Sequence, residues 1–265
     1  MPHSSSTRWR SPAAALQCPL RLLTLVAFLA GGLPEAGRTA DMTVEQVKAL
    51  LATPGQGVPD LSNRDLGGLD LSNIDFKRAN LTGAAMRKTN LAGADLSGSV
   101  LDLAILRGAN LKGAKLRDVS AFSTIFASAD LSGADLSGAK LVCNFENANL
   151  RGANLQGVAA GADMRNQSMG LMRISLRNAK LGGANLAGAD ISRGMIEFAD
   201  LSGADLTGAN LMRAAAGGAD FSSANLAGAN FTEADVQDAR FMGAVGLDKA
   251  IGFDTVLHKD SARFE

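Results

Sequence analysis

The sequence lacks most of the bulky aromatic residues that fill ordinary protein cores. Its 265 residues include no tyrosine and one tryptophan, and aromatic residues make up 5% of the chain although hydrophobic residues make up 46%. An interior with this composition must be filled with leucine, alanine and a few phenylalanines. The scarcity of aromatic residues therefore favours a thin, repetitive core over a single large one.

Proline is missing from most of the chain. All six prolines lie at or before Pro59, and none occurs between there and the C-terminus. Because proline cannot donate a hydrogen bond to a β-ladder, its absence favours a continuously hydrogen-bonded β structure in this part of the sequence.

Residues that carry out catalysis or bind metals are also scarce. Of two cysteines, Cys18 lies near the N-terminus, and Cys143 is expected to point inward as a small buried hydrophobe. His258 lies near the C-terminus, where no pattern places a nucleophile and a carboxylate beside it. No cysteine and histidine cluster predicts zinc, and no phosphate-binding fingerprint stands between a strand and a helix. The sequence therefore predicts that the protein is not an enzyme and has no catalytic residue, metal, cofactor or small-molecule substrate.

The N-terminal segment, residues 1–40, has the pattern of a targeting segment. Three arginines precede an apolar run over residues 22–30, and no acidic residue occurs before Glu35. Ala30-Gly31-Gly32 then offers a processing site. The apolar run is shorter than the roughly 20 residues of a membrane-spanning helix. We expect residues 1–40 to be a bacterial export signal, which predicts a periplasmic or secreted protein. An uncleaved membrane anchor and a transit peptide for an organelle lumen are the alternatives.

A short helix is expected over residues 43–52. Thr43-Val44-Glu45-Gln46 fits a capping box, and the apolar residues from Val44 to Leu51 fall on one helical face. Thr53-Pro54-Gly55 would end the helix. We interpret residues 41–57 as a capping helix and linker that cover one end of the structure that follows.

From Leu61 onward a large apolar residue recurs at every fifth position. A small residue, usually alanine, lies two positions before each of these centres, and aspartate or asparagine usually lies one position before it. This period fits neither an α-helix nor the alternation of a β-strand. It fits a square coil in which each side contributes one large and one small residue to a shared interior. The first centres are Leu61, Leu66, Leu71, Phe76 and Leu81.

The stretch from Ala129 to Gly138, ADLSGADLSG, contains the pattern A-(D/N)-L-x-x twice in succession. Through such tandem matches the chain resembles the pentapeptide-repeat family over residues 58–246. The resemblance implies an all-β fold, a right-handed quadrilateral β-helix with four pentapeptides in each coil. Phe221 and Phe241 would then lie one coil apart on the same side, with stacked rings. The Asp and Asn side chains are expected to bond nearby backbone at the corners.

The period is interrupted in two places before it ends. One residue is missing between Leu141 and Phe145, and residues 158–170 lose the pattern before it returns at Leu176. We interpret the second interruption as a bulge or projecting loop, which is either a packing irregularity or a recognition loop. Residues 247–265 leave the repeat and are expected to form a C-terminal cap or a pairing surface for a second chain.

Two features of the outer surface are candidates for an interaction site. Ile105 and Ile125 occupy the position where Asp or Asn is usual, and Phe122 should also face outward, which predicts a small apolar patch. Although 26 basic residues balance 26 acidic ones, residues 77–117 are mainly basic and residues 190–238 mainly acidic. We expect these stretches to lie on different coils and not to neutralise one another. The basic candidates for contact are Arg87, Arg107, Lys112 and Arg117.

These observations favour a non-catalytic, exported β-helical scaffold that mediates protein–protein interaction. We expect an unknown protein partner, no direct contact with nucleic acid, and weak self-association through the C-terminal cap or head to tail. The alternative comes from the family resemblance: some pentapeptide-repeat proteins resemble DNA in shape and charge, bind DNA gyrase and give protection from fluoroquinolones. Those rods are acidic and cytoplasmic, whereas this sequence is neutral and begins with a signal-like segment. The scaffold is therefore the favoured hypothesis.

Overall fold

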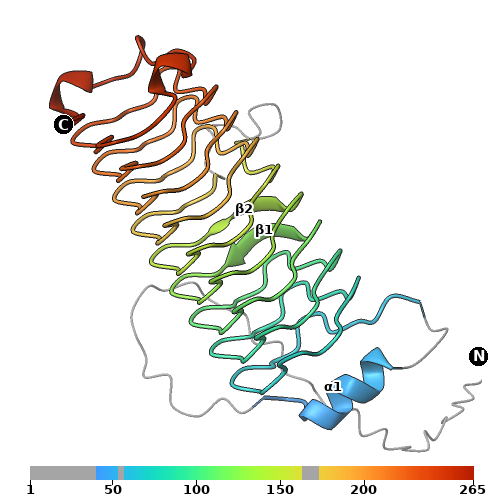
Figure 1. Cartoon of the computed structure of the whole chain (residues 1–265). Coiled ribbons are helices and arrows are strands. Elements are labelled where there is room, and N and C mark those ends of the chain that lie inside the picture. The colour runs from blue at the N-terminus through green and yellow to red at the C-terminus, as the bar shows by residue number, and fades with distance from the viewer. Residues whose placement is uncertain (1–39, 53–56, 163–172) are drawn as a thin grey trace, which may run out of the picture. The chain divides into compact units, whose positions relative to one another are not determined.

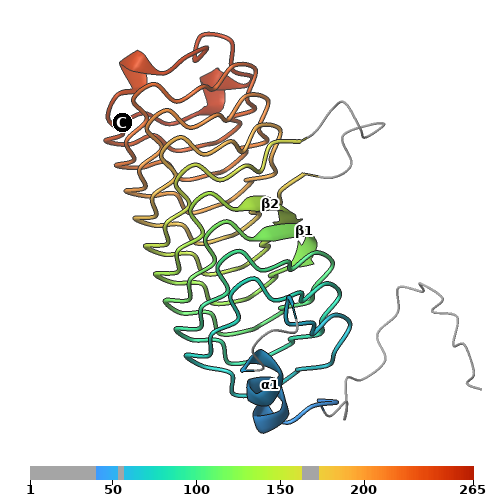
Figure 2. The same cartoon turned by 90° about the vertical axis from the view of Figure 1, so that its right-hand side faces the viewer.

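The computed structural model describes residues 40–52, 57–162 and 173–265. From Asp60 onward the backbone winds into a stack of coils, which Figure 1 and Figure 2 show from two directions. Residues in adjoining coils pair in parallel at intervals of 20, as Asp60 pairs with Asn80 and Asn80 with Val100. Four such columns of paired residues run along the stack. This arrangement is that of a quadrilateral β-helix.

Each pentapeptide forms one side of a coil and one corner. The centre donates its N–H to the next coil, as Leu61 does to the carbonyl of Asn80 at 2.8 Å. Two corner residues follow, and the N–H of the second also bonds the next coil, as Asn63 does to Thr82 at 2.8 Å. This second residue has a positive φ, 57° at Asn63 and 67° at Gly83, which explains why glycine is frequent there. The five-residue period of the sequence is therefore the period of the corners.

The interior is a column of large centres with alanines between them. Leu81 and Ala84 are fully buried, and most residues in equivalent positions are buried to the same extent. Burying each leucine stabilises the fold by roughly 1.5–3 kcal/mol, so the core is a sum of many similar contributions. Phe221 and Phe241 stack with ring centroids 5.0 Å apart and 6° between the ring planes, which confirms the expected register.

Aspartate and asparagine side chains hold the corners, as expected. Asp60 Oδ1 accepts the backbone N–H of Ser62 at 3.0 Å and the side-chain N–H of Asn80, one coil further, at 3.0 Å. These bonds satisfy polar groups outside the core and tie adjoining coils together. The bond to the backbone two residues on recurs at Asp70, Asn80, Asp95, Asn110 and Asp130.

Helix α1 (Val44–Leu51) packs on the first coil. Its capping box is formed: Thr43 Oγ1 accepts the N–H of Gln46 at 3.3 Å, and Gln46 Oε1 accepts the N–H of Thr43 at 2.8 Å. Val47 is fully buried and joins the hydrophobic core. The chain before the helix is tied to the same coil, because Asp41 donates its N–H to the carbonyl of Asp65 at 2.9 Å. The helix therefore shields the interior at this end.

The stack accommodates the residue that is missing after Leu141. Strands β1 (Ser120–Ile125) and β2 (Lys140–Asn144) pair in parallel, and their register shifts between Phe122 and Ile125. Although one residue has been lost, Phe145 still stacks on Phe126, with ring centroids 4.8 Å apart and 12° between the planes. The change is therefore absorbed at the corner and does not reach the core.

A second change of register follows Ala160. Ala159 pairs with Lys140 on one side and with Asp190 on the other, so the chain between Ala159 and Asp190 is longer than a regular coil. Ala160 is fully buried, so the repeat continues further than the sequence pattern indicated. The pattern was hidden because alanine occupies this centre in place of a large residue. The rest of the interruption expected at 158–170 lies outside the described residues from 163 onward.

The C-terminal segment, residues 247–265, keeps its pairing with the coil before it. Arg263 pairs with Arg240, and because their separation exceeds the regular interval, this last coil is wider than the others. Two 3-10 helices, Leu247–Lys249 and Lys259–Ser261, take up the additional length. The segment that was expected to leave the repeat therefore continues it as an enlarged coil.

Phenylalanines fill the interior at this end. Phe264 stacks on Phe241 with centroids 5.5 Å apart, and Phe253 meets the rings of Phe231 and Phe241 edge-on. Such contacts add roughly 0.5–1.5 kcal/mol per pair to the burial of area. Within the parts of the chain that the structure describes, no helix has the length and apolar character needed to cross a membrane.

Candidate interaction surface

One side of the stack differs from the other three. Elsewhere the residue before the centre is usually Asp, Asn or a charged residue, whereas on this side it is mostly Ala, Ile, Ser or Met. Both changes of register fall at the corner that leads into this side, where Figure 2 shows β1 and β2. We call it the apolar side. Its column of paired residues begins at Asp65 and ends with Asp235 and Leu257, and between them lie Ala85, Ile105, Ile125, Asn144, Ser175, Met195 and Ala215.

The predicted apolar residues lie here in two rows. Ile105 and Ile125 pair across adjoining coils and are half-buried. Phe122 lies at the preceding corner with 39% of its surface exposed. The N–H of Leu103 donates to the carbonyl of Phe122 at 2.8 Å, and Val142 pairs with Phe122 on its other side. Leu103, Phe122 and Val142 thus form a second apolar row, parallel to the row of isoleucines.

Leu103, which the sequence reasoning missed, has a strained backbone. Its φ is 62°, in the left-handed region that bulky residues rarely adopt, and 57% of its surface is exposed. Burial therefore does little to offset the strain. At other corners this position is held mainly by glycine or by polar and charged residues, and Phe198 is the one other large apolar residue with a positive φ among those described. The signal in the sequence was a leucine where glycine, asparagine or another polar residue is usual.

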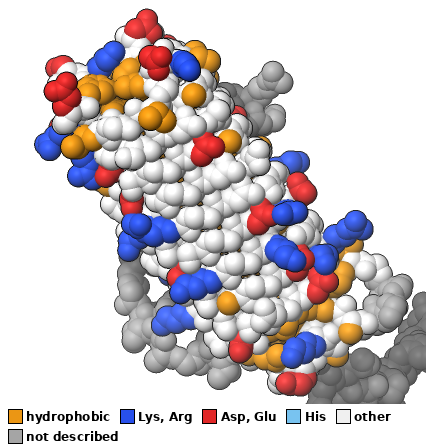
Figure 3. All heavy atoms as spheres, in the orientation of Figure 1, with side chains coloured by type: hydrophobic (Ala, Val, Ile, Leu, Met, Phe, Trp, Pro, Cys, Tyr) orange, Lys and Arg blue, Asp and Glu red, His pale blue; other side chains and the backbone are white. Residues whose placement is uncertain are grey.

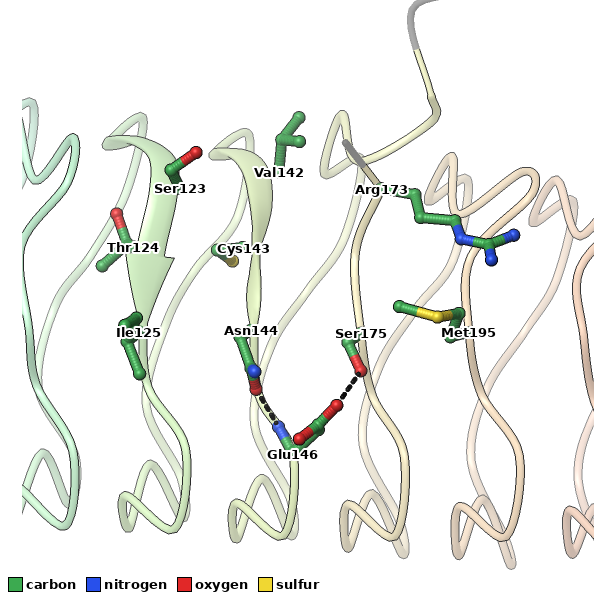
Figure 4. Close-up of a pocket in the computed structure, with 10 residues that line it drawn as sticks. All are labelled: Ser123, Thr124, Ile125, Val142, Cys143, Asn144, Glu146, Arg173, Ser175 and Met195. Atoms are coloured by element: carbon green, nitrogen blue, oxygen red, sulfur yellow. Dashed lines mark hydrogen bonds between the residues drawn. The ribbon is translucent and has the colours of Figure 1, made fainter. Parts of the chain in front are cut away.

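A shallow groove continues the apolar rows toward the second half of the stack, and Figure 4 shows the residues that line it. Ile125 lies at one end, Val142 on the next coil, and Met195 at the other end, near Arg173. Between them the Ser175 hydroxyl donates to Glu146 Oε1 at 3.1 Å. The groove therefore combines apolar walls with a carboxylate that is already engaged by a hydroxyl.

Cys143 lines this groove but is itself buried, with 4% of its surface exposed. Burial raises the pKa of its thiol well above the usual range, so the group stays protonated and unreactive at neutral pH. His258 lies elsewhere, on the last coil, with Nδ1 2.8 Å from Asp235 Oδ1, and this carboxylate raises the pKa of the imidazole. In the described ranges, no group of three His, Cys, Asp or Glu residues is placed to hold a metal ion.

The basic candidates of the sequence divide into two groups. Lys112 pairs with Asp130 at 3.4 Å, and Arg117 pairs with Asp135. Both cations are exposed, so each pair adds little to stability, but it balances the local charge. Lys112 and Arg117 therefore lie at sites that already hold a carboxylate.

The second group lies at the corner that follows the apolar side. Arg87 and Arg107 come directly after the buried centres Met86 and Leu106. Lys88 lies beside Arg107, because its N–H donates to the Arg107 carbonyl at 3.1 Å. Neither Lys88 nor Arg107 forms an ion pair with another residue that the structure describes. This corner is therefore a basic edge of the apolar side.

Several carboxylates of the acidic stretch are paired as well, and Figure 3 shows acidic and basic side chains lying together at places on the face in view. No ion pair between described residues joins the two stretches to one another, as expected, but many of their charges are balanced by a residue of a nearby coil. Most of these charges find their partner in the adjoining coil, about 20 positions along the chain, whereas Arg151 and Asp200 are 49 positions apart. The pairs are Glu197 with Arg177, Asp200 with Arg151, Asp220 with Arg240, Glu233 with Arg213 and Asp235 with His258.

Comparison with known proteins agrees with the coil geometry. The model of pentapeptide repeats matches in eight copies, over residues 60–91, 86–120, 123–166, 171–208 and 209–245. The chain belongs to the pentapeptide-repeat family. Proteins of this family fold as right-handed quadrilateral β-helices. Membership of the family is consistent with a non-catalytic repeat scaffold.

Solved structures of other pentapeptide-repeat proteins resemble this one. HetL of the cyanobacterium Nostoc sp. strain PCC 7120, a protein involved in regulating heterocyst differentiation, is 28% identical, with 84% of this chain and 94% of HetL covered and a TM-score of 0.47. QnrB1, a plasmid-mediated fluoroquinolone resistance protein, is 20% identical, with 76% and 93% covered and a TM-score of 0.51. The likeness to QnrB1 shows a shared fold and nothing of function. No curated protein matches the chain.

Proposed function

We propose that this pentapeptide-repeat protein is a non-catalytic scaffold that is exported from the cytoplasm and binds a partner protein through the apolar side. The observation that carries the proposal is the pair of apolar rows, in which Leu103 and Phe122 are exposed beside Ile105 and Ile125. Contiguous exposed apolar residues on a water-soluble surface are typical of contact sites.

The coil provides a rigid support for such a site. Every residue in the two rows belongs to a coil whose backbone is bonded to both neighbours, as Ile105 pairs with Ala85 on one side and with Ile125 on the other. A surface that is already ordered loses little conformational entropy when it binds. Exposed side chains on this support can therefore contribute most of their contact energy to affinity.

Export is supported by the basic residues and the short apolar run within residues 1–40. We expect the protein recovered from the periplasm or culture medium to have lost about 30–40 N-terminal residues, as in signal-peptide cleavage. Intact mass spectrometry of fractionated cells measures this loss. Recovery of the full-length chain from the cytoplasm alone would contradict the export part of the proposal.

Site-specific photo-crosslinking tests the binding part. A benzoylphenylalanine at Phe122 should give a discrete crosslinked product in cells, because this side chain lies in the exposed row. The same photoreactive residue at Ser202, a half-exposed corner on another side of the stack, serves as the control. Equal products from both positions, or none from Phe122, would contradict binding through the apolar side.

A further inference from the structure

We infer that the apolar side takes an extended peptide segment of its partner in which an apolar residue is followed, three to five positions away, by acidic residues. The inference rests on the proposed function and adds to it the chemistry of the partner. Its elements are the corner row of Leu103, Phe122 and Val142, the central row of Ile105 and Ile125, and the basic edge of Lys88 and Arg107. We call these seven residues together the docking patch.

The docking patch has an apolar border and a basic border on opposite edges of one side of the stack. Within a single coil, Leu103 lies at one corner, Ile105 on the side and Arg107 at the next corner. An extended peptide advances about 3.3 Å per residue, as the coil itself does along its sides. A segment that lies along the coil therefore reaches from the apolar corner to the basic corner within three to five residues.

The conformation of Leu103 indicates that the apolar corner has a role beyond the stability of the fold. A leucine at φ 62° strains the backbone, and its 57% exposure means that the folded chain alone gains little from it. Glycine occupies the equivalent position in the coil before it, at Gly83, with φ 67° and no such strain. Strain of this kind persists mainly where a bound partner or a function offsets it.

The basic edge indicates that the bound segment of the partner carries negative charge. Lys88 and Arg107 form no ion pair among the described residues, in contrast to Lys112 and Arg117 nearby. The acidic residue closest in sequence to the apolar corner, Asp102, already accepts hydrogen bonds from the Ser120 hydroxyl at 2.7 Å and the Phe122 N–H at 2.9 Å. Charge complementarity therefore favours carboxylates opposite Lys88 and Arg107.

A second copy of this chain is a poorer occupant. Several of its carboxylates in residues 190–238 are engaged, as Glu197 is with Arg177 at 2.6 Å and Asp220 with Arg240 at 2.7 Å. Contact between copies through these carboxylates would have to break such pairs. A separate acidic segment meets the patch without that cost.

Selection from a random peptide library tests the inference. The full chain is immobilised, and a random twelve-residue library displayed on phage is panned against it at low salt. We expect enriched peptides to carry Leu, Ile, Val or Phe followed three to five positions later by Asp or Glu. A synthetic copy of the most enriched peptide is then measured by fluorescence anisotropy, and its affinity should fall about tenfold or more at high salt, where exposed charges are screened.

Variants locate the binding site. Leu103→Gly should weaken the selected peptide about fivefold or more while leaving the fold intact, because glycine suits this corner. Phe198→Gly is the matched control, since Phe198 is also exposed with a positive φ of 59° but lies outside the docking patch. Lys88→Glu combined with Arg107→Glu should abolish binding. Lys180→Glu combined with Lys249→Glu makes the same change of net charge elsewhere and should leave binding unchanged.

Other outcomes overturn the inference in distinguishable ways. Enriched peptides without acidic residues, or peptides that bind Leu103→Gly and the Lys88/Arg107 variant as well as the unaltered chain, would contradict the partner chemistry while leaving a protein-binding scaffold in place. No enrichment at all would contradict both. Binding of phosphatidylglycerol vesicles that depends on Lys88 and Arg107, with no peptide selected, would identify an anionic membrane as the occupant.

Discussion

Leucine has two opposite roles in this molecule, and they depend on the position within the pentapeptide. At the centre, as in Leu206, the side chain is fully buried, and the two residues that follow form the corner. At the second corner position, as in Leu103, it is exposed on a strained backbone. The same residue type therefore stabilises the stack in one position and strains its backbone in the other.

Shortening a central leucine should be costly. Leu206→Ala is expected to lower the free energy of unfolding by about 2–5 kcal/mol, because it leaves a cavity in a narrow core. Ser202→Ala is the control and should change stability by no more than about 0.5 kcal/mol, since the Ser202 backbone keeps its bond to Asp200. Denaturant unfolding of both variants measures the difference. Equal destabilisation would contradict the register of the coils.

Removing the strained leucine should be harmless or favourable. Leu103→Gly is expected to leave stability unchanged or to raise it by up to about 1 kcal/mol, because relief of left-handed strain is partly offset by the flexibility of glycine in the unfolded chain. The measurement is again denaturant unfolding. A loss of more than about 1 kcal/mol would show that Leu103 stabilises the stack and would contradict its assignment to the docking patch.

At the scale of elements, α1 and the last coil close the interior by different means. The helix covers the first coil with Val47 and is held by its capping box, whereas the C-terminal coil is filled by stacked phenylalanines. Repeat stacks depend on such ends, since each coil buries its surface only against its neighbours. A substitution that destabilises one end should therefore destabilise the coils nearest that end first.

The helix cap allows a test of this dependence. Thr43→Ala removes the hydroxyl that accepts the Gln46 N–H and should destabilise α1 by about 1 kcal/mol. We expect hydrogen exchange to become faster in residues 44–51 and in the first coil, with little change in the coils near Phe221. Lys48→Ala, which alters an exposed residue in the last turn of the same helix and leaves the capping box in place, is the control. Uniformly faster exchange along the chain would instead indicate that the stack unfolds as a single unit.

The sequence was most informative where each element repeats and least informative where one residue departs from the pattern. The period of five predicts the coils, because every corner needs the same backbone, and it predicts the ring stack of Phe221 and Phe241. It missed Ala160, whose small side chain hides a buried centre, and Leu103, whose role depends on a neighbour one coil away. The individual ion pairs were missed for the same reason, since partners such as Arg213 and Glu233 are 20 residues apart.

At the scale of the whole molecule, many of the charges are balanced locally. Carboxylates such as Glu233 and Asp220 lie against arginines of the adjoining coil. Duplex DNA, in contrast, presents an uninterrupted series of phosphates. The surface of this stack therefore differs in charge from duplex DNA.

This difference predicts the result of a gyrase assay. Micromolar concentrations of the purified protein should leave the supercoiling activity of DNA gyrase unchanged, because paired carboxylates do not reproduce the field of a phosphate backbone. Agarose gel electrophoresis of relaxed plasmid measures supercoiling, with an acidic member of the family that inhibits gyrase as the positive control. Dose-dependent inhibition, or restored supercoiling in the presence of a fluoroquinolone, would support the DNA-mimic alternative.

The two changes of register have a consequence for how such a protein can change over generations. Phe145 keeps its place on Phe126 although the coil between them is one residue short, and Ala159 pairs with Asp190 although the chain between them exceeds a regular coil. A gene for such a stack can therefore gain or lose codons at this corner in a single event, without compensating mutations elsewhere. Within a regular strand, by contrast, one inserted residue moves every following side chain to the opposite face. Here natural selection can vary the length of the segment beside the apolar side while inheriting the rest of the molecule unaltered.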